Sequence, residues 1–163
     1  MIAEFNSPRE KMYNPAMRLP ILLPLFAVIP LLAQASDEKD AVATVQKTFN
    51  GMAAHDAAMI LSTMLPEARL YSVRDEAAPG GRSADEFARQ IGAAKGDLLE
   101  RFTSQPSVSI RGRMAQVWGE YEFVRDGKFS HCGVDSVSLL KTAEGWKIAT
   151  IVFTMETTGC KGH

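Results

Sequence analysis

The chain has 163 residues, of which 46% are hydrophobic and 23% charged, and its formal net charge is −1. A length in this range is typical of a single domain with one hydrophobic core. The 18 basic and 19 acidic residues form no basic stripe, which argues against a nucleic-acid partner. No acidic or membrane-seeking face is evident either.

The first 35 residues carry the pattern of a secretory signal peptide. Arg18 precedes an uncharged, largely apolar run that ends in Ala33-Gln34-Ala35, a small-x-small pattern that signal peptidase favours. A membrane anchor is the alternative, but an anchor needs about 20 apolar residues, and three prolines interrupt this run. Residues 1–16 are polar and consistent with an over-called start. We therefore expect a mature domain over residues 36–163, secreted or periplasmic, without stable membrane insertion.

The first half of this domain predicts helices. Apolar residues recur every three or four positions from Ala41 to Met52, which predicts a long helix with Ser36 or Asp37 at its N-cap. Asp56 is expected to cap a short second helix that ends before Pro66.

The next segment mixes signals. "ARLYSVRD", residues 68–75, is a strand candidate, and "EAAPGGRS", residues 76–83, reads as a loop because of its Pro-Gly-Gly. Residues 84–102 return to helical spacing, with Gly96 expected to end the helix.

From Val108 onward the pattern changes to three long strands joined by tight turns, the first around Asp126-Gly127. Helices followed by an antiparallel meander predict an α+β fold in which the helices cover one face of the sheet.

Register follows from the hydrophobic pattern. A three-residue turn at Asp126-Gly127-Lys128 would pair Arg125 with Phe129, whereas a two-residue turn would shift every pair by one and place apolar residues opposite serines. We therefore expect the first register. It pairs Phe123 with His131, Tyr121 with Gly133, Gly119 with Asp135, Val117 with Val137, and Ala115 with Leu139, all on the covered face.

This order of elements, with the segments "AQVWGEYEF", "HCGVDSVSLLK" and "GWKIATIVFT", resembles the nuclear transport factor 2-like superfamily, which includes ketosteroid isomerases and polyketide cyclases. The bacterial exported, lumazine-binding-like branch is the most similar. The resemblance implies helices packed on a strongly curved antiparallel sheet, forming a cone-shaped half-barrel with a pocket. Its motifs mark the fold and not a reaction, so no catalytic residue is carried over.

The candidate pocket residues are those expected on the covered face: Tyr121, His131, Asp135, Val117, Gly119 and Val137. A metal site is not expected, because His131 and Asp135 would lie about 13 Å apart on a strand. An Asp facing an apolar cavity tends to have a raised pKa, and a Tyr hydroxyl can stabilise an oxyanion. The alternative is a structural Asp135, hydrogen-bonded as buried carboxyls usually are.

Strand-end arginines are a second candidate feature. Arg74, Arg111 and Arg113 could clamp a ligand carboxylate, although solvated charges are the commoner outcome.

Three function hypotheses remain open. The first is an exported protein that binds a small organic molecule in an apolar pocket, without a cofactor. The second is a cofactor-free isomerase, dehydratase or cyclase that transfers protons through Asp135 or His131 with Tyr121. The third is a non-catalytic interaction domain. The state of Asp135 discriminates between the first two, because an unpaired carboxyl favours catalysis.

The outer sheet face is expected to form a homodimer interface. Apolar side chains would otherwise be exposed there as a patch; these are Trp118, Val134, Leu140, Ile151 and Phe153.

Two cysteines, Cys132 and Cys160, lie in the exported part. An oxidising compartment favours a bridge, and Gly159 lets the chain bend back toward the sheet. We therefore predict a disulfide between them that pins the C-terminal tail, with two free thiols as the alternative. The expected register places Cys132 opposite Met155.

Overall fold

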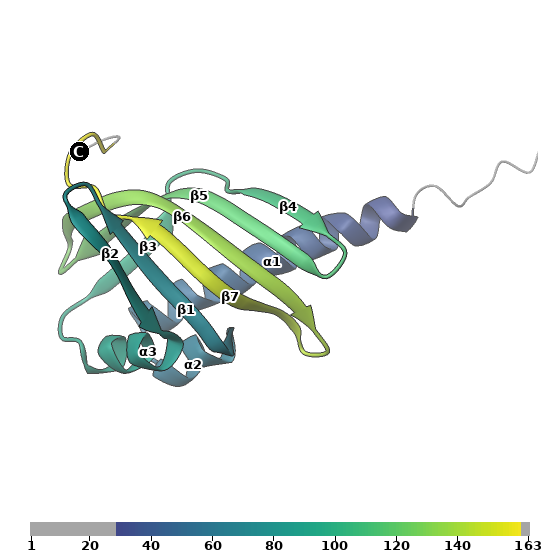
Figure 1. Ribbon diagram of the computed structural model, residues 1–163, viewed down its shortest axis with the longest axis horizontal. Coiled ribbons are helices and arrows are strands. Elements are labelled where there is room, and N and C mark those ends of the chain that lie inside the picture. Colours follow the sequence, from purple (N-terminus) through teal and green to yellow (C-terminus); the bar gives the residue numbers. More distant parts are fainter. Residues whose placement is uncertain (1–28, 161–163) are drawn as a thin grey trace, which may run out of the picture.

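Three helices cover one face of a seven-stranded sheet, and the other face carries no helix (Figure 1). The computed structural model describes residues 29–160, so residues 1–28 of the predicted signal peptide lie outside the described part. In chain order the elements are α1 Ile29–Ala53, α2 Ala57–Ser62, β1 Met64–Arg74, β2 Ala77–Ser83, α3 Ala84–Ala93, β3 Leu98–Phe102, β4 Ser107–Arg111, β5 Met114–Arg125, β6 Lys128–Thr142 and β7 Gly145–Thr154. The predicted α+β fold with a curved, mostly antiparallel sheet is confirmed.

Helix α1 packs its apolar stripe against the sheet. Ala41, Val45 and Phe49 are buried in the core, as their helical spacing predicts. The helix begins at Ile29, so the expected N-cap at Ser36 or Asp37 is wrong. Asp37 instead forms an ion pair with Lys141 of β6.

The two shorter helices begin at polar caps. Asp56 accepts a hydrogen bond from the backbone N–H of Met59 at 2.8 Å, which confirms the expected cap of α2. Ser83 and Glu86 form a capping box at the start of α3.

Two segments differ from the sequence-based expectation. Residues 77–83, expected to be a loop, form β2, which pairs with β1. Glycine permits this pairing: a Cβ at Gly81 would lie 2.9 Å from the Tyr71 ring. Helix α3 ends at Ala93, three residues before the expected end at Gly96, which takes a positive φ of 79° in the following turn. Residues 98–102, for which no strand was expected, form β3.

The strands follow the order β2-β1-β7-β6-β5-β3, with β4 also paired to β5. The five expected pairs between β5 and β6, from Phe123 with His131 to Ala115 with Leu139, are confirmed. The tip differs from expectation, because Arg125 pairs with Lys128 around a two-residue turn at Asp126-Gly127. A register shift between Phe123 and Val124 then brings the remaining pairs of β5 and β6 into the expected register.

A second irregularity changes the last strand. Lys141 pairs with Trp146 as expected, but the register shifts between Ser138 and Leu139, with Ala149 as the extra residue of β7. The side chains beyond Ala149 therefore face the opposite side from that predicted. Ile151 is 7% exposed and lies in the core, and Phe153 packs against it, so neither belongs to the outer patch.

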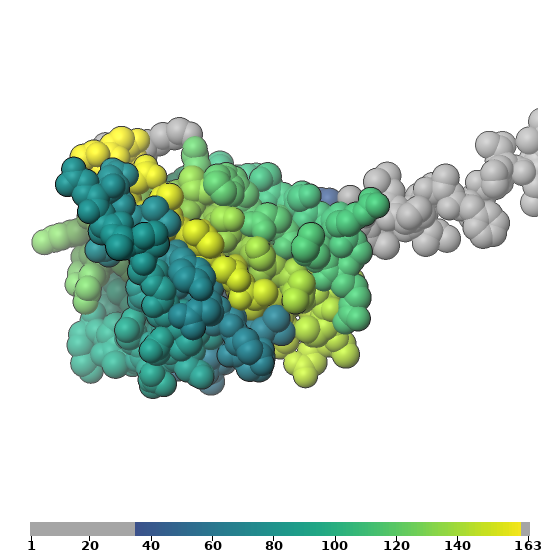
Figure 2. Space-filling view, in the orientation of Figure 1, coloured from purple at the N-terminus to yellow at the C-terminus, as the bar shows by residue number. Residues whose placement is uncertain are grey.

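The outer face nevertheless retains exposed apolar side chains. Its large members are Met114, Trp118, Leu140 and Val152, which are 57%, 53%, 43% and 38% exposed. Figure 2 shows this side of the molecule, with the C-terminal segment (yellow) beside the β1–β2 hairpin (teal).

No helix within residues 29–160 combines the length and apolar character that crossing a bilayer requires.

Candidate functional site

The helix-covered face of the sheet divides into an apolar and a polar part. Val117, Val137 and Leu139 are fully buried in the hydrophobic core. Toward the β5–β6 turn, the same face of the same strands carries Asp135 and His131 instead. Phe123 and His131 are only half-buried, so solvent reaches this end of the covered face.

Asp135 lies at the boundary between the two parts. It is 2% exposed, and within the described chain its Oδ2 atom has no hydrogen-bond partner. A buried carboxylate oxygen without a partner destabilises the fold, because the oxygen loses its hydrogen bonds to water on folding and gains none in the protein. Burial raises the pKa of Asp135 to about 7, and a hydrogen bond with Glu100 partly opposes this rise.

Glu100 on β3 is the partner that the sequence-based reading missed. Its carboxyl forms a side-chain hydrogen bond with that of Asp135, and burial, followed by the negative charge of Asp135, raises the pKa of Glu100 well above its ordinary value. Two adjacent carboxyls cannot both ionise cheaply, so the pair holds one proton near neutral pH. The two carboxyls share this proton through their side-chain hydrogen bond.

A weak sequence signal marked Glu100. Leu98, Glu100 and Phe102 alternate with Leu99 and Arg101, which is the period of a strand. The break at Gly96 supports the same assignment. However, Glu100 is charged and lies on the inward side of this five-residue segment, so the segment lacks the apolar alternation that marks a buried strand face.

Tyr121 lies on the covered face and is fully buried. Its hydroxyl donates to the backbone carbonyl of Thr154 at 2.7 Å, across Gly133. Gly133 is required here, because a Cβ at this position would lie 2.2 Å from the Thr154 carbonyl oxygen. Burial, and then the charges of Glu100 and Asp135, raise the pKa of Tyr121, so the phenol stays protonated.

His131 stacks on Phe123 with ring centroids 5.0 Å apart, and the edge of Tyr121 lies 5.8 Å away. Burial, and then the charge of Arg74, lower the pKa of His131, which favours a neutral imidazole near pH 7. Its Nδ1 lies 3.1 Å from the hydroxyl of Ser130.

The remaining predicted residues are placed as follows. Val117 and Val137 form part of the closed core, and Gly119 lies opposite Asp135. A Cβ at Gly119 would come within 2.6 Å of the Phe102 ring, so this glycine makes room for the ring.

Of the three strand-end arginines, Arg74 contacts Met155, and Arg113 donates to the carbonyl of Lys141 at 2.8 Å. Arg111 is exposed.

The disulfide between Cys132 and Cys160 is confirmed, with Cα atoms 5.9 Å apart. The bulge in β7 makes Glu156, not Met155, the residue opposite Cys132. Backbone hydrogen bonds of 2.9 and 2.8 Å join these two residues in both directions.

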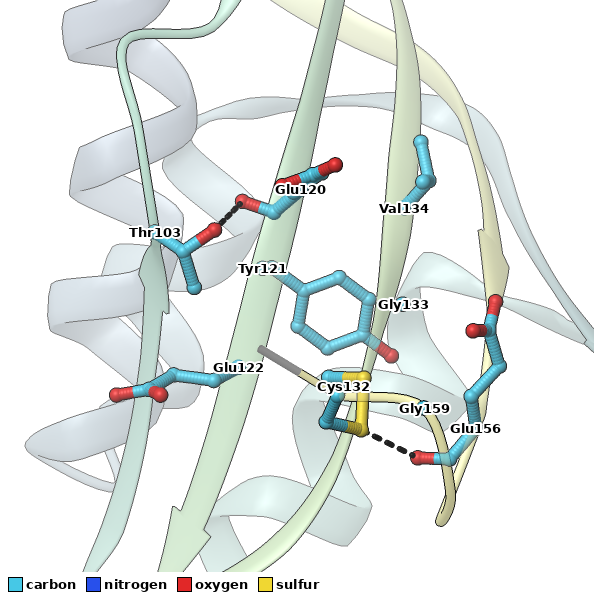
Figure 3. Close-up of a pocket in the computed structure, with 10 residues that line it drawn as sticks. Thr103, Glu120, Tyr121, Glu122, Cys132, Gly133, Val134, Glu156 and Gly159 are labelled. Atoms are coloured by element: carbon cyan, nitrogen blue, oxygen red, sulfur yellow. Dashed lines mark hydrogen bonds between the residues drawn. A yellow bond between two sulfur atoms is a disulfide. The ribbon is translucent and has the colours of Figure 1, made fainter. Parts of the chain in front are cut away.

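A small pocket opens beside this disulfide, with a volume of about 110 Å³. Figure 3 shows Thr103, Glu120 and Glu122 on one side of it and Glu156 on the other. This volume is below the usual range for small-molecule sites, roughly 300–1,000 Å³. The pocket shares Tyr121 with the interior pocket expected from the sequence, and the rest of that interior pocket stays a prediction.

Residues 29–160 bring no three His, Cys, Asp or Glu side chains together in a way that could hold a metal ion. The polar part offers a carboxyl pair with one proton, a neutral phenol and a neutral imidazole.

No protein-family model and no curated protein matches the chain. Solved structures do. A nuclear transport factor 2-like protein with a cystatin-like fold from Novosphingobium aromaticivorans has a TM-score of 0.68 and 14% identity, covering 84% of this chain and 92% of its own. A superfamily protein from Salmonella enterica has a TM-score of 0.63 and 14% identity, covering 80% and 98%.

A third protein, from Silicibacter pomeroyi, has a TM-score of 0.57 and 20% identity, covering 75% and 98%, and is described as of unknown function. These similarities show that the chain has the nuclear transport factor 2-like fold.

Proposed function

We propose that the protein binds a small organic molecule at the polar part of the covered face, with Asp135 as the principal acceptor. The unpartnered Oδ2 of Asp135 carries this proposal, and the same atom is required by the proton-transfer candidate described below. A core carboxyl with a purely structural role is normally satisfied on both oxygens. Here, among the described residues, the Asp135 carboxyl shares a proton with Glu100, and Oδ2 has no other hydrogen-bond partner.

The surroundings support the same role. Phe123 and His131 present flat ring surfaces beside the acid pair and are partly solvent-exposed. A ligand with an apolar body and one hydrogen-bond donor would bury the body against these rings and offer the donor to Asp135.

Native mass spectrometry of the protein purified from the envelope of its host tests this proposal. We expect the wild type to retain a small organic molecule and Asp135→Asn to lose most of it. Asp85→Asn, at an exposed position in the first turn of α3, is the matched control and should retain the molecule. Equal retention by all three proteins would contradict the role of Asp135.

A second candidate is cofactor-free proton transfer, favoured by the coupled carboxyl pair. With a pKa of about 7, Asp135 can take a proton from a bound substrate near neutral pH. Isomerisation, dehydration or cyclisation would use such a step. Exchange of a ligand C–H hydrogen with deuterium from solvent, lost in Asp135→Asn, would identify this activity; binding without exchange would leave the protein a binder.

Export is the proposed setting, and the lumazine-binding-like exported branch is the proposed affiliation. The signal-peptide pattern of residues 17–35 supports export, and a disulfide is the state expected of two cysteines in an oxidising compartment. An N-terminal sequence of the exported protein beginning near Ser36 would support the cleavage site, whereas retention of residues 19–33 would contradict it.

A homodimer through the outer sheet face remains part of the proposal. Trp118, Met114 and Leu140 are exposed on the side of the sheet that carries no helix. Burying such side chains is favourable, and a symmetric dimer closes the patch. If the outer face alone bound partners, the protein would instead be an interaction domain, and Asp135→Asn would leave its binding unchanged.

A further inference from the structure

Strand β4 is an open edge of the sheet. Within residues 29–160 it pairs with β5 alone, and Figure 1 shows it at the margin of the sheet with α1 behind it. The strand at the opposite edge, β2, contains Pro79 and two glycines, residue types that weaken strand pairing. The sequence of β4, SVSIR, contains neither proline nor glycine and alternates serine with β-branched residues. Of these two edges, β4 is therefore the one suited to accept a further strand.

The hairpin register shows which backbone groups of β4 point outward. Strand β4 joins β5 through the two-residue turn Gly112-Arg113, in which Gly112 has a φ of 59°, so Arg111 forms the closing pair of the hairpin. The closing pair of a two-residue hairpin is hydrogen-bonded, and hydrogen-bonded and non-hydrogen-bonded pairs alternate along an antiparallel ladder. The N–H and C=O groups of Val108 and Ile110 therefore point away from β5, and no other residue of the described chain bonds to them.

A groove of about 650 Å³ lies between this edge and α1. Val42 and Ala43 of α1 line one side of it, and Pro106 and Val108 line the other. The side chain of Val108 faces the covered side of the sheet, because its partner Val117 is buried there. A strand added to β4 would point every second side chain toward this groove. Its volume lies within the usual range for binding sites, roughly 300–1,000 Å³.

The charges around the groove are mainly positive. Glu38 and Lys39 of α1 lie at the groove, and Arg111 and Arg113 lie at the C-terminal end of β4. Arg111 is exposed, and alternation places its side chain on the outer face of the sheet. An acidic residue directly opposite Arg111 on an added strand would form a favourable cross-strand pair. This end of the edge is therefore complementary to an acidic partner.

We propose that the β4 edge and the groove beside it bind an extended peptide as an additional antiparallel strand. The peptide has an acidic residue opposite Arg111, followed by apolar residues opposite Ile110 and Val108 with any residue between them. Its backbone exchanges hydrogen bonds with Ile110 and Val108, and the apolar side chain opposite Val108 enters the groove. In strand addition of this kind, backbone hydrogen bonds provide affinity and alternate side chains provide selectivity. The site is separate from Asp135 and does not depend on the function proposed above.

N-methylated peptides test the backbone contacts. The probe is a fluorescein-labelled, capped peptide, Thr-Glu-Val-Thr-Val-Thr, and its affinity for the protein is measured by fluorescence anisotropy. In the proposed register the amides of its two valines point toward β4, and the amide of the threonine between them points to solvent. A methyl group on either valine nitrogen should weaken binding about tenfold or more, because it removes a hydrogen bond and collides with a β4 carbonyl. A methyl group on the middle threonine nitrogen is the matched control and should change the affinity by less than about twofold.

A charge exchange tests the register. Arg111→Glu should weaken the glutamate peptide about two- to fivefold and strengthen the same peptide carrying lysine in place of glutamate by a similar factor. Lys128→Glu makes the same change of charge at an exposed position beside the β5–β6 turn, at the opposite end of β5. This control variant should bind both peptides as the wild type does.

Hydrogen exchange locates the contact. The amides of Val108 and Ile110 should exchange rapidly in the free protein and slowly once the peptide is added. Equal weakening by all three methyl groups, or no binding at millimolar peptide, would overturn the proposal. Slow exchange of the same two amides in the free protein, accelerated by dilution, would show that a second copy occupies the edge and would overturn the peptide partner.

Discussion

The apolar and polar parts of the covered sheet face are built from the same strands, but their side chains have different roles. Toward the β6–β7 turn, Val137 and Leu139 are fully buried in the hydrophobic core. Toward the β5–β6 turn, Asp135 and His131 occupy equivalent positions of the same strand. The first set stabilises the fold by burial, whereas Asp135, buried and incompletely hydrogen-bonded, costs stability.

This contrast separates scaffold from site. A protein keeps a destabilising buried carboxyl when another requirement selects it, and binding sites are where such groups concentrate. Substitutions in the two parts should therefore have effects of different size and, for Asp135, of opposite sign.

The largest effect is expected in the apolar part. Leu139→Ala should lower the free energy of unfolding by about 2–5 kcal/mol, because it leaves a cavity in a fully buried region. His131→Ala should lower the free energy of unfolding by distinctly less, because the His131 ring lies outside that core and is half-buried. Urea denaturation of both variants measures the difference, and equal losses would show that the covered face is one uniform core.

The disulfide offers a second way to separate the parts. Replacing both cysteines by alanine should lower the free energy of unfolding by about 2–4 kcal/mol, the typical worth of such a bridge. Hydrogen exchange should rise in residues 153–160 and around Cys132, while α1 and residues 137–141 stay protected. Uniform loss of protection would mean that the tail supports the whole sheet.

The dependence of stability on pH should reflect the raised pKa of Asp135. Because folding raises its pKa from 3.8 to about 7, the native protein binds more protons between these values, and the free energy of unfolding falls as pH rises from about 4 to 7. Asp135→Asn should reduce this fall and make the protein about 1–3 kcal/mol more stable than the wild type at about pH 8. Thermal melts across pH measure it.

A loss of stability in Asp135→Asn at every pH would contradict this expectation. It would identify Asp135 as a structural residue whose carboxylate the fold requires.

The smallest effect on stability is expected on the outer face. Trp118→Ser should change the free energy of unfolding of the protomer by about 0.5 kcal/mol or less, because the side chain is exposed. Its effect should appear in association instead. Sedimentation at micromolar concentration should show a dimer for the wild type and a larger monomer fraction for the variant; a monomeric wild type would exclude the interface.

Sequence patterns were sufficient where alternation was regular. The pairing of β5 with β6 followed from alternation and a turn signal, since one buried face strongly specifies register. The disulfide followed from an even pair of cysteines in an expected oxidising compartment, with Gly159 to bend the tail back. The prediction that Ile151 lies on the outer face was wrong, because one extra residue, Ala149, reverses which face the following side chains point to. No residue type in the sequence marks the position of this bulge.

Glu100 shows a different limit. A five-residue strand with a charged inward residue carries too little periodicity to compete with the helical pattern before it, and the carboxyl pair exists only because the curved sheet brings β3 and β6 together. Long-range proximity of this kind cannot be derived from local spacing.

Carbon-detected NMR titration of the Asp135 and Glu100 carboxyl groups in the free protein tests the central claim most directly. The structure predicts a coupled pair: Asp135 titrating near pH 7, the pKa of Glu100 well above its ordinary value, and Glu100→Gln altering the titration of Asp135. Two independent carboxyls that both titrate near pH 4, unaffected by each other's substitution, would contradict the account, because the buried acceptor on which the proposed site rests would not exist.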